Sequence, residues 1–361
     1  MKIDFINLQA QYQKYKIDID KQIQEVLDSS AYIGGKVTKL EEKLNSFVGC
    51  KHSIACSSGT DALILSLMAV GLQPDDEVIT TAFTFIATAE AIAFLKAKPV
   101  FVDIDGKTFN IDSSKIEEKI TNKTKVILPV SLFGQISNMD EINNIAKKHQ
   151  LIVIEDGAQS FGASYNNKIS GNLCDIGTTS FFPAKPLGCY GDGGAIFTND
   201  DKIAQKLRVL LNHGQTAKYI HSDIGINGRL DAIQAAVLIA KLDYYQDEID
   251  KRDKIASRYT KELKTVKTPI VLNGLRSVWA QYSVLSDDRE KLMKRCQNKG
   301  VPTAVYYPIP LHLQKVFSYL GYKDGDLPKT EKISKEIFSL PISAFLKDDE
   351  QSYIIEVLNN G

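Results

Sequence analysis

Short apolar runs alternate with amphipathic, helix-like segments through the first two-thirds of the chain. Several of these runs are apolar at consecutive positions, which predicts strands buried on both faces. They cover residues 77–81, 99–104, 125–130, 151–156 and 177–182. Helical patterns lie between them at residues 61–70, 84–95, 139–149 and 201–211. Strand and helix in repeated succession predict right-handed crossovers and a mainly parallel α/β sheet.

The pattern changes near Arg229. Residues 229–259 read as one long amphipathic helix with heavy charge on one face, and a strand at 281–285 and a helix at 289–299 follow. A proline-rich loop, residues 307–310, comes next. We therefore predict a large domain over residues 1–240 and a small α+β domain over residues 241–361.

Composition and charge narrow the range of functions. The 361 residues are 43% hydrophobic and 24% charged, as in a globular protein with a sizeable core. Lysine plus arginine and aspartate plus glutamate both number 44, so no overall positive field attracts nucleic acid. No run of 18 apolar residues predicts a membrane span, and the N-terminal residues lack a signal-peptide pattern. We expect a cytoplasmic protein without nucleic-acid or membrane partners.

The cysteines and histidines indicate no metal centre. Five cysteines are scattered without a C-x-x-C pair, which argues against both a metal site and a disulfide framework. A reducing compartment suits such a set of thiols.

Three local motifs carry the candidate chemistry. In the first, an apolar strand at 53–56 runs into Ser57-Ser58-Gly59-Thr60 and then directly into a helix. Such a turn offers free backbone N–H groups, hydroxyls and the positive end of a helix, all of which bind phosphate. The alternative interpretation is an ordinary serine or threonine N-cap.

The second motif is a buried strand that ends in acid, residues 151–156, followed by Gly157-Ala158-Gln159-Ser160. Ligands of open parallel sheets lie at the carboxyl ends of the strands. Asp156 at that end could pair with a cationic ring nitrogen, as the pyridinium of pyridoxal phosphate requires. Alternatively, Asp156 caps the turn that follows.

The third motif places Lys185 just after the apolar strand 177–182, within a segment rich in proline and glycine. Removal from water there would lower the pKa of the lysine and favour the neutral amine that forms a Schiff base. A solvated surface lysine is the alternative, and Ser180 could add a hydroxyl to a phosphate site. A phosphate pocket, a carboxylate and an amine at one sheet edge together predict a pyridoxal-phosphate site.

These motifs stand in a sequence that resembles the DegT/DnrJ/StrS family of sugar aminotransferases from Ile6 to the C-terminus. The matching segments are 57–63, 83–88, 101–105, 155–160, 180–185, 191–195, 212–214, 227–231 and 307–312. The resemblance implies the type I pyridoxal-phosphate transferase fold, that of aspartate aminotransferase, and a homodimer with shared active sites. A dehydratase of this family would carry histidine in place of Lys185.

Site residues follow from the same resemblance. Lys185 resembles the Schiff-base lysine that also carries the proton, Asp156 the partner of the pyridinium, and Gln159 the residue beside the ring hydroxyl. Phe85 resembles the aromatic residue stacked on the ring. Phosphate contacts are implied for Gly59, Thr60, Ser180 and, from the neighbouring subunit, Asn227.

Details around residues 129–135, 182–194 and 280–282 resemble the WbpE-like branch, which aminates C3 of UDP-2-acetamido-2-deoxy-3-keto-glucuronate with L-glutamate as donor. A uronate carboxylate needs a cation, and the residues expected to contact substrate are Arg229, His213, His312 and Tyr307. Two departures, Tyr306 for a usual histidine and Leu285 for a frequent arginine, leave open a neutral 3-keto- or 4-keto-6-deoxy sugar on UDP or dTDP. A sugar dehydratase and a regulatory protein that binds pyridoxal phosphate are the remaining alternatives.

Overall fold

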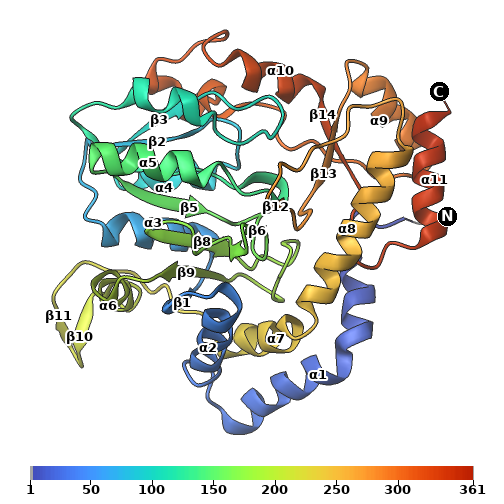
Figure 1. Cartoon of the computed structure of the whole chain (residues 1–361). Helices are drawn as coiled ribbons and strands as arrows, with labels where there is room; N and C mark the ends of the chain where they lie inside the picture. The colour runs from blue at the N-terminus through green and yellow to red at the C-terminus, as the bar shows by residue number, and fades with distance from the viewer. Residues whose placement is uncertain (1–2, 361) are drawn as a thin grey trace.

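The computed structural model describes residues 3–360 and is built around a mainly parallel sheet (Figure 1). Within these residues the sheet has seven strands in the order β1-β9-β8-β5-β4-β2-β3. Four neighbouring pairs, from β8 to β3, are parallel, whereas β9 is antiparallel to both β1 and β8. The strands are β1 (His52–Cys56), β2 (Glu77–Thr81), β3 (Lys98–Val102), β4 (Thr124–Ile127), β5 (Ile152–Asp156), β8 (Ile176–Ser180) and β9 (Gly194–Thr198).

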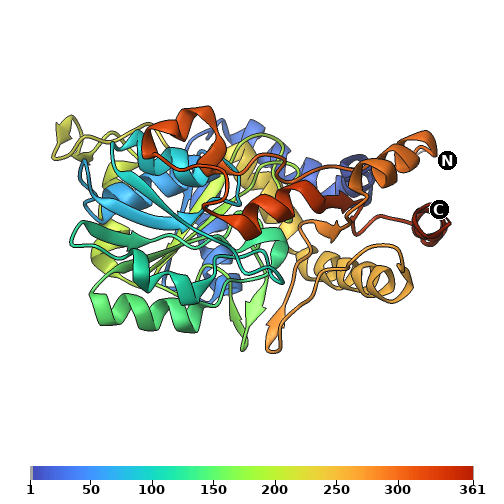
Figure 2. The same ribbon diagram turned by 90° about the horizontal axis from the view of Figure 1, so that it is seen from above.

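Helices cover both faces of this sheet, as the view from above shows (Figure 2). Consecutive strand residues point to opposite faces. Val153 therefore joins the cluster under α2 (Lys36–Val48), α5 (Met139–His149) and α7 (Ala232–Leu242). Its neighbour Ile154 joins the cluster under α3 (Gly59–Ala69), α4 (Ala87–Phe94) and α6 (Asp201–Leu210). Burial on both faces is the reason that these strands read as continuous apolar runs.

The predicted α/β architecture is confirmed, and the strands and helices lie within a few residues of their expected positions. β2 and α5 have the predicted bounds, whereas β4 ends at Ile127 and β8 at Ser180, both earlier than expected. Strand β9 was not predicted, because the glycine-rich segment at its start has the composition of a loop. Gly194 is needed there: a Cβ atom on it would lie 2.4 Å from the carbonyl oxygen of Ser58.

The prediction of one long helix over residues 229–259 is wrong. The segment forms two helices, α7 and α8 (Tyr245–Glu262), which run in different directions (Figure 1). α7 is buried on nearly every side, whereas α8 carries the charged face. The chain turns at Tyr244, whose ring stacks on that of Tyr15 in α1 (Leu8–Ser29) with 4.2 Å between ring centroids.

The C-terminal part forms a smaller α+β unit beside the sheet. α8 extends towards it and packs there with the β13 (Tyr282–Leu285) and β14 (Ile337–Leu340) pair, α9 (Arg289–Asn298) and α11 (Asp348–Asn359) (Figure 1). Ile3 and Leu358 belong to the same apolar cluster, so the two ends of the described part of the chain lie close together. The predicted domain boundary after residue 240 lies within the last turn of α7, and α8 begins at Tyr245.

The remaining elements are short or lie at the periphery. They are β6 (Ser164–Tyr165), β7 (Lys168–Ile169), β10 (Gln215–Ala217), β11 (Ile220–His221), β12 (Leu275–Arg276) and α10 (Pro328–Glu336). Across residues 3–360 we find no helix with the length and apolar character needed to cross a membrane.

Candidate active site

The turn from β1 into α3 has the properties of a phosphate site. The hydroxyl of Ser58 caps α3 by accepting from the N–H of Asp61 at 3.0 Å. Gly59 and Thr60 are the first two residues of the helix, where backbone N–H groups have no intrahelical acceptor. A Cβ atom on Gly59 would lie 2.6 Å from the Cβ of Ser180, so the end of β8 closes against this turn. The predicted contacts Gly59, Thr60 and Ser180 are thus brought together.

Asp156 lies at the carboxyl end of β5, where it is 5% exposed. The hydroxyl of Thr88 donates to its Oδ2 at 2.7 Å, and the N–H of Ala158 donates to its Oδ1 at 3.2 Å. Thr84 Oγ1 lies 3.0 Å from Thr88 Oγ1, one turn away. Both hydroxyls are buried, so this chain of hydrogen bonds fixes the direction of the carboxylate.

Lys185 occupies the loop between β8 and β9, where its side chain is half-buried. Burial lowers the pKa of its ε-amino group, and the negative charge of Asp156 opposes that fall without cancelling it. A lysine with a lowered pKa supplies more neutral amine, the form that attacks a carbonyl carbon.

Gln159 and Tyr307 join the structure on the same side. Gln159 donates to the hydroxyl of Tyr307 at 3.0 Å and accepts from the N–H of Phe133 at 2.9 Å. Burial raises the pKa of Tyr307; the hydrogen bond from Gln159 opposes this rise and the charge of Asp156 adds to it. The exposed ring of Phe85 lies 6.4 Å from that of Tyr307, between centroids. Five of the predicted residues therefore lie around one site: Asp156, Lys185, Gln159, Tyr307 and Phe85.

Behind Asp156, the side chain of Glu155 holds three segments together. Its carboxyl group accepts from Ser131 Oγ at 2.6 Å, Ser170 Oγ at 2.8 Å and the N–H of Gly171 at 2.7 Å. Glu155 is fully buried, and burial raises its pKa despite these hydrogen bonds. The sequence motif ending in Glu155-Asp156 thus contains two carboxyl groups with different surroundings.

A second group of predicted residues lies beside the phosphate-type turn. The carbonyl of Gly228 accepts from the N–H of Ser57 at 2.8 Å, which places the segment around it against the end of β1. The half-buried guanidinium of Arg229 donates to Asn212 Oδ1 at 2.6 Å. Asn227 and His213 are exposed, and a single β-bridge joins Asn227 to Asn212.

His312 has different surroundings from the other predicted substrate contacts. It is 1% exposed, and its Nε2 lies 3.0 Å from Glu331 Oε1. Its ring packs near that of Tyr322, with centroids 6.1 Å apart. The polar contact recorded for His312 is thus within the core of the fold, and a part in substrate binding stays a prediction.

Sequence reasoning missed Thr88 and Thr84. The signal was weak: the two threonines are four residues apart in the predicted helix 84–95, but α4 begins only at Ala87, and nothing in the sequence connects either threonine with Asp156, which follows Thr88 by 68 residues. Only the parallel arrangement of β2 and β5 about β4 brings them together.

The donor set fits one cofactor in particular. A phosphate pocket, a carboxylate for a ring nitrogen and an amine for an aldehyde converge at the carboxyl edge of a parallel sheet, the place where open α/β sheets bind ligands. Pyridoxal phosphate requires all three groups. The chain belongs to the DegT/DnrJ/EryC1/StrS aminotransferase family, which matches residues 13–359. It is accordingly a pyridoxal-phosphate-dependent aminotransferase, as the resemblance implied.

Two relatives match almost the whole chain. The UDP-2-acetamido-2-deoxy-3-oxo-D-glucuronate aminotransferase of Pseudomonas aeruginosa is 48% identical over 361 residues, which covers 99% of this chain and 100% of the relative. A protein of Geobacillus stearothermophilus described as a pleiotropic regulatory protein is 47% identical over 362 residues, covering 99% of this chain and 97% of the relative.

Solved structures agree with the fold and the cofactor. A DegT/DnrJ/EryC1/StrS aminotransferase from Brucella abortus is similar with a TM-score of 0.95 and 42% identity, covering 99% of both chains. NtdA from Bacillus subtilis, solved with bound PMP, is similar with a TM-score of 0.93 and 34% identity, covering 99% of this chain and 84% of that one. The predicted aminotransferase fold is confirmed by these similarities.

Proposed function

We propose that this enzyme transfers the amino group of L-glutamate to C3 of UDP-2-acetamido-2-deoxy-3-keto-glucuronate, for the synthesis of a surface polysaccharide or another glycan. The observation that carries the proposal is the 48% identity, over the full length of both chains, with the Pseudomonas aeruginosa aminotransferase that is named for this substrate. The lysine–aspartate pair and the phosphate-type turn supply the chemistry that such a transfer requires.

Each residue of the site has a defined part in the proposal. Gly59, Thr60 and Ser180 hold the phosphate, and Asp156, directed by Thr88, holds the ring nitrogen. When bound, pyridoxal phosphate supplies an aldehyde carbon and a conjugated ring that accepts electrons. Lys185 holds that carbon and, once released, moves the proton as a general acid–base, because its lowered pKa leaves more of it neutral.

Gln159, Tyr307 and Phe85 orient the ring in this proposal. Gln159 already bonds the hydroxyl of Tyr307, so the two side chains form one polar edge beside the aromatic ring of Phe85. Lys185 and Asp156 would then face a cofactor ring that these three side chains hold in place.

The sugar carboxylate is assigned to Arg229. A guanidinium has five N–H donors and can bind a carboxylate with two parallel hydrogen bonds. Asn212 accepts one hydrogen bond from Arg229 in the structure and thereby directs the guanidinium. Leaving a uronate without a cation would be costly once it is removed from water. His213 lies next to Asn212 in the chain, and we include it, with Tyr307 and His312, among the candidate substrate contacts.

The test compares kcat/KM for the 3-keto uronic acid with kcat/KM for the matching 6-deoxy keto-sugar. Wild-type enzyme should favour the uronate, and Arg229→Ala should lose most of that preference while keeping its activity on the neutral sugar. Arg295→Ala, which removes a guanidinium group from the C-terminal unit, is the matched control. Faster turnover of the neutral sugar by wild type would overturn the substrate assignment.

A neutral 3-keto- or 4-keto-6-deoxy sugar is the second candidate. The observation in its favour is that Tyr306 and Leu285 occupy positions where histidine and arginine are usual in this family. For such a sugar, Arg229 would contact a diphosphate oxygen, and Arg229→Ala would then lower kcat/KM equally for both substrates. Lysine at position 185 argues against the dehydratase alternative, and 2-oxoglutarate formed from glutamate would exclude a purely regulatory role.

Assembly and location complete the proposal. We propose a homodimer in which Asn227 reaches the phosphate site of the neighbouring subunit and Arg229 reaches substrate across the same interface. Asn227 is exposed, as such a contact needs. Mixing inactive Lys185→Ala protein with an inactive Asn227→Ala/Arg229→Ala protein should restore activity. No recovery, despite proven subunit exchange, would count against shared sites. Free thiols at all five cysteines suit a cytoplasmic location.

A further inference from the structure

The loop that carries Lys185 receives hydrogen bonds from two buried cations. Lys241, near the end of α7, donates to the carbonyl oxygen of Gly188. Arg252, on α8, donates to the carbonyl oxygen of Pro186 at 3.1 Å. The two residues are 2% and 8% exposed. These contacts bracket the loop immediately after Lys185.

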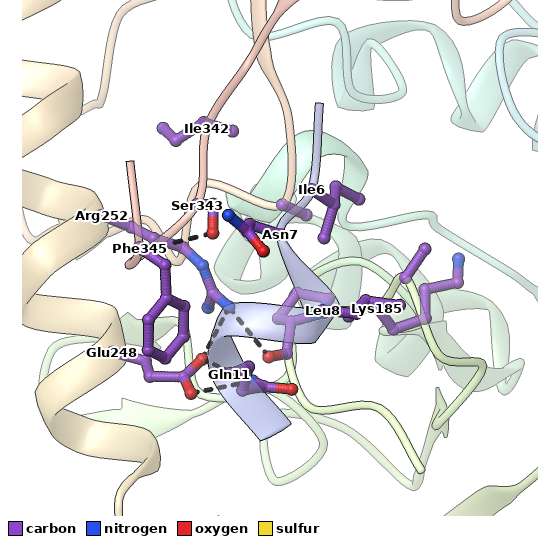
Figure 3. Close-up of a pocket in the computed structure, with 13 residues that line it drawn as sticks. Ile6, Asn7, Leu8, Gln11, Lys185, Glu248, Arg252, Ile342, Ser343 and Phe345 are labelled. Carbon is purple, nitrogen blue, oxygen red and sulfur yellow. Dashed lines mark hydrogen bonds and ion pairs between the residues drawn. The ribbon is translucent and has the colours of Figure 1, made fainter. Parts of the chain in front are cut away.

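A polar network holds Arg252 in place. Glu248, one helical turn earlier, accepts from Arg252 at 3.0 Å. Gln11, in the first turns of α1, donates to both carboxylate oxygens of Glu248, at 2.8 and 3.0 Å. Figure 3 shows these three side chains gathered on one side of a pocket whose lining also includes Lys185. The amine of Lys185 points away from them, so they contact the loop from behind.

The two ends of the loop between β8 and β9 have their own hydrogen bonds. The N–H of Lys185 donates to the carbonyl of Phe182 at 2.8 Å, the N–H of Cys189 donates to the carbonyl of Phe181 at 2.8 Å, and the N–H of Tyr190 donates to Gln234 Oε1 at 2.9 Å. Between these bonds, at residues 186–188, the recorded hydrogen bonds are those from Lys241 and Arg252. Burying a cation costs free energy unless it is well hydrogen-bonded. Two such cations aimed at carbonyl groups of one loop are therefore poorly explained as packing, because apolar side chains would fill the space at lower cost.

We propose that Lys241 and Arg252 are positioning residues, which hold the loop so that the ε-amino group of Lys185 meets the cofactor aldehyde. The inference rests on the proposed role of Lys185. Neither cation touches the reacting atoms; each acts through the backbone that carries the lysine. Glu248 and Gln11 act one step further away, by directing Arg252.

The experiment separates cofactor binding from covalent attachment. Apo-enzyme is mixed with pyridoxal phosphate, total bound cofactor is measured after filtration, and attachment is followed by borohydride trapping with peptide mass spectrometry. In Lys241→Met and Arg252→Met proteins, binding through the phosphate should persist. Attachment to Lys185 should slow by on the order of tenfold or more, as expected for loss of a charged hydrogen bond.

Two comparisons make the test specific. Arg295 donates to the carbonyl of Leu358 at 3.1 Å, far from Lys185 in the C-terminal unit, so Arg295→Met should leave the attachment rate unchanged. Lys241→Arg and Arg252→Lys keep a cation and should recover part of the rate. Hydrogen exchange of residues 182–190 in the holoenzyme should quicken in the methionine variants and not in Arg295→Met.

The outcomes distinguish this inference from the proposed function. A wild-type adduct on a lysine other than Lys185 would refute the site assignment itself. A wild-type adduct on Lys185, with wild-type attachment and exchange rates in both methionine variants, would overturn the inference alone. If those variants fail to fold, Lys241→Gln and Arg252→Gln decide, because they keep a polar side chain but remove the charge: wild-type attachment and exchange rates in both would equally overturn the inference.

Discussion

The hydroxyl of Thr88 provides a direct test of how Asp156 works. Thr88→Val keeps the shape of the side chain and removes the 2.7 Å hydrogen bond to Asp156 Oδ2. Thr88 is 1% exposed, so water cannot readily replace the lost donor. A hydrogen bond to a charged group is worth about 1.5–3 kcal/mol net. If that energy supports the charged pair between Asp156 and the ring nitrogen, kcat should fall by about 10- to 100-fold.

Stopped-flow spectroscopy should show this decrease in both half-reactions, with glutamate and with the keto-sugar, since the same carboxylate serves both. Thr88→Ser restores the hydroxyl and should recover most of the rate. Thr84→Val, which acts one hydrogen bond further away at 3.0 Å, should have a smaller effect. Wild-type kcat in Thr88→Val would show that the orientation of Asp156 does not depend on this hydroxyl, and the reasoning would be refuted.

Three further predictions address the cofactor site and its supports. Lys185→Ala should lose the borohydride-trapped adduct while keeping some bound cofactor; an adduct remaining on any other lysine, located by peptide mass spectrometry, contradicts the assignment. Gly59→Ala places a Cβ atom 2.6 Å from that of Ser180, so its Kd for pyridoxal phosphate, measured by titration, should rise on the order of tenfold; an unchanged Kd would mean that the turn can move. Burial lowers the pKa of Lys241 from 10.5 to about 8, so between these pH values the folded protein binds fewer protons than the unfolded one and its unfolding free energy rises with pH. Denaturation at several pH values should therefore show that the unfolding free energy of wild type, relative to that of Lys241→Met, increases by about 3 kcal/mol from pH 8 to 10.5. Parallel pH profiles of the two unfolding free energies would contradict the burial argument.

The sequence predicted those parts of the fold in which local pattern and final environment agree. Residues 151–154 are apolar in succession because β5 is buried on both faces, and α5 has one clear apolar side. The prediction failed at β9, where a glycine that serves close packing against Ser58 looks like a loop residue. It failed again at Tyr244, where the chain turns between α7 and α8, because the ring that stacks on Tyr244 belongs to Tyr15 in α1, a helix far away in the sequence.

The site shows the same division. Asp156 and Lys185 could be identified because each follows a buried strand, and the sheet order then places them together. Lys241 and Arg252 could not, since on a predicted long helix they read as members of a solvated charged face. Their contacts depend on where α7 and α8 separate. Long-range contacts of this kind leave no periodic signal in the sequence.

The buried carboxyl group of Glu155 also has a consequence for how this protein reaches its native state. Successive residues of a strand face opposite ways, so a slip of β5 by one residue would exchange the environments of Glu155 and Asp156. Such a slip would take the carboxyl group of Glu155 away from Ser131, Ser170 and Gly171, and that of Asp156 away from Thr88. A sheet with β5 out of register is therefore penalised at the same two positions that the chemistry needs.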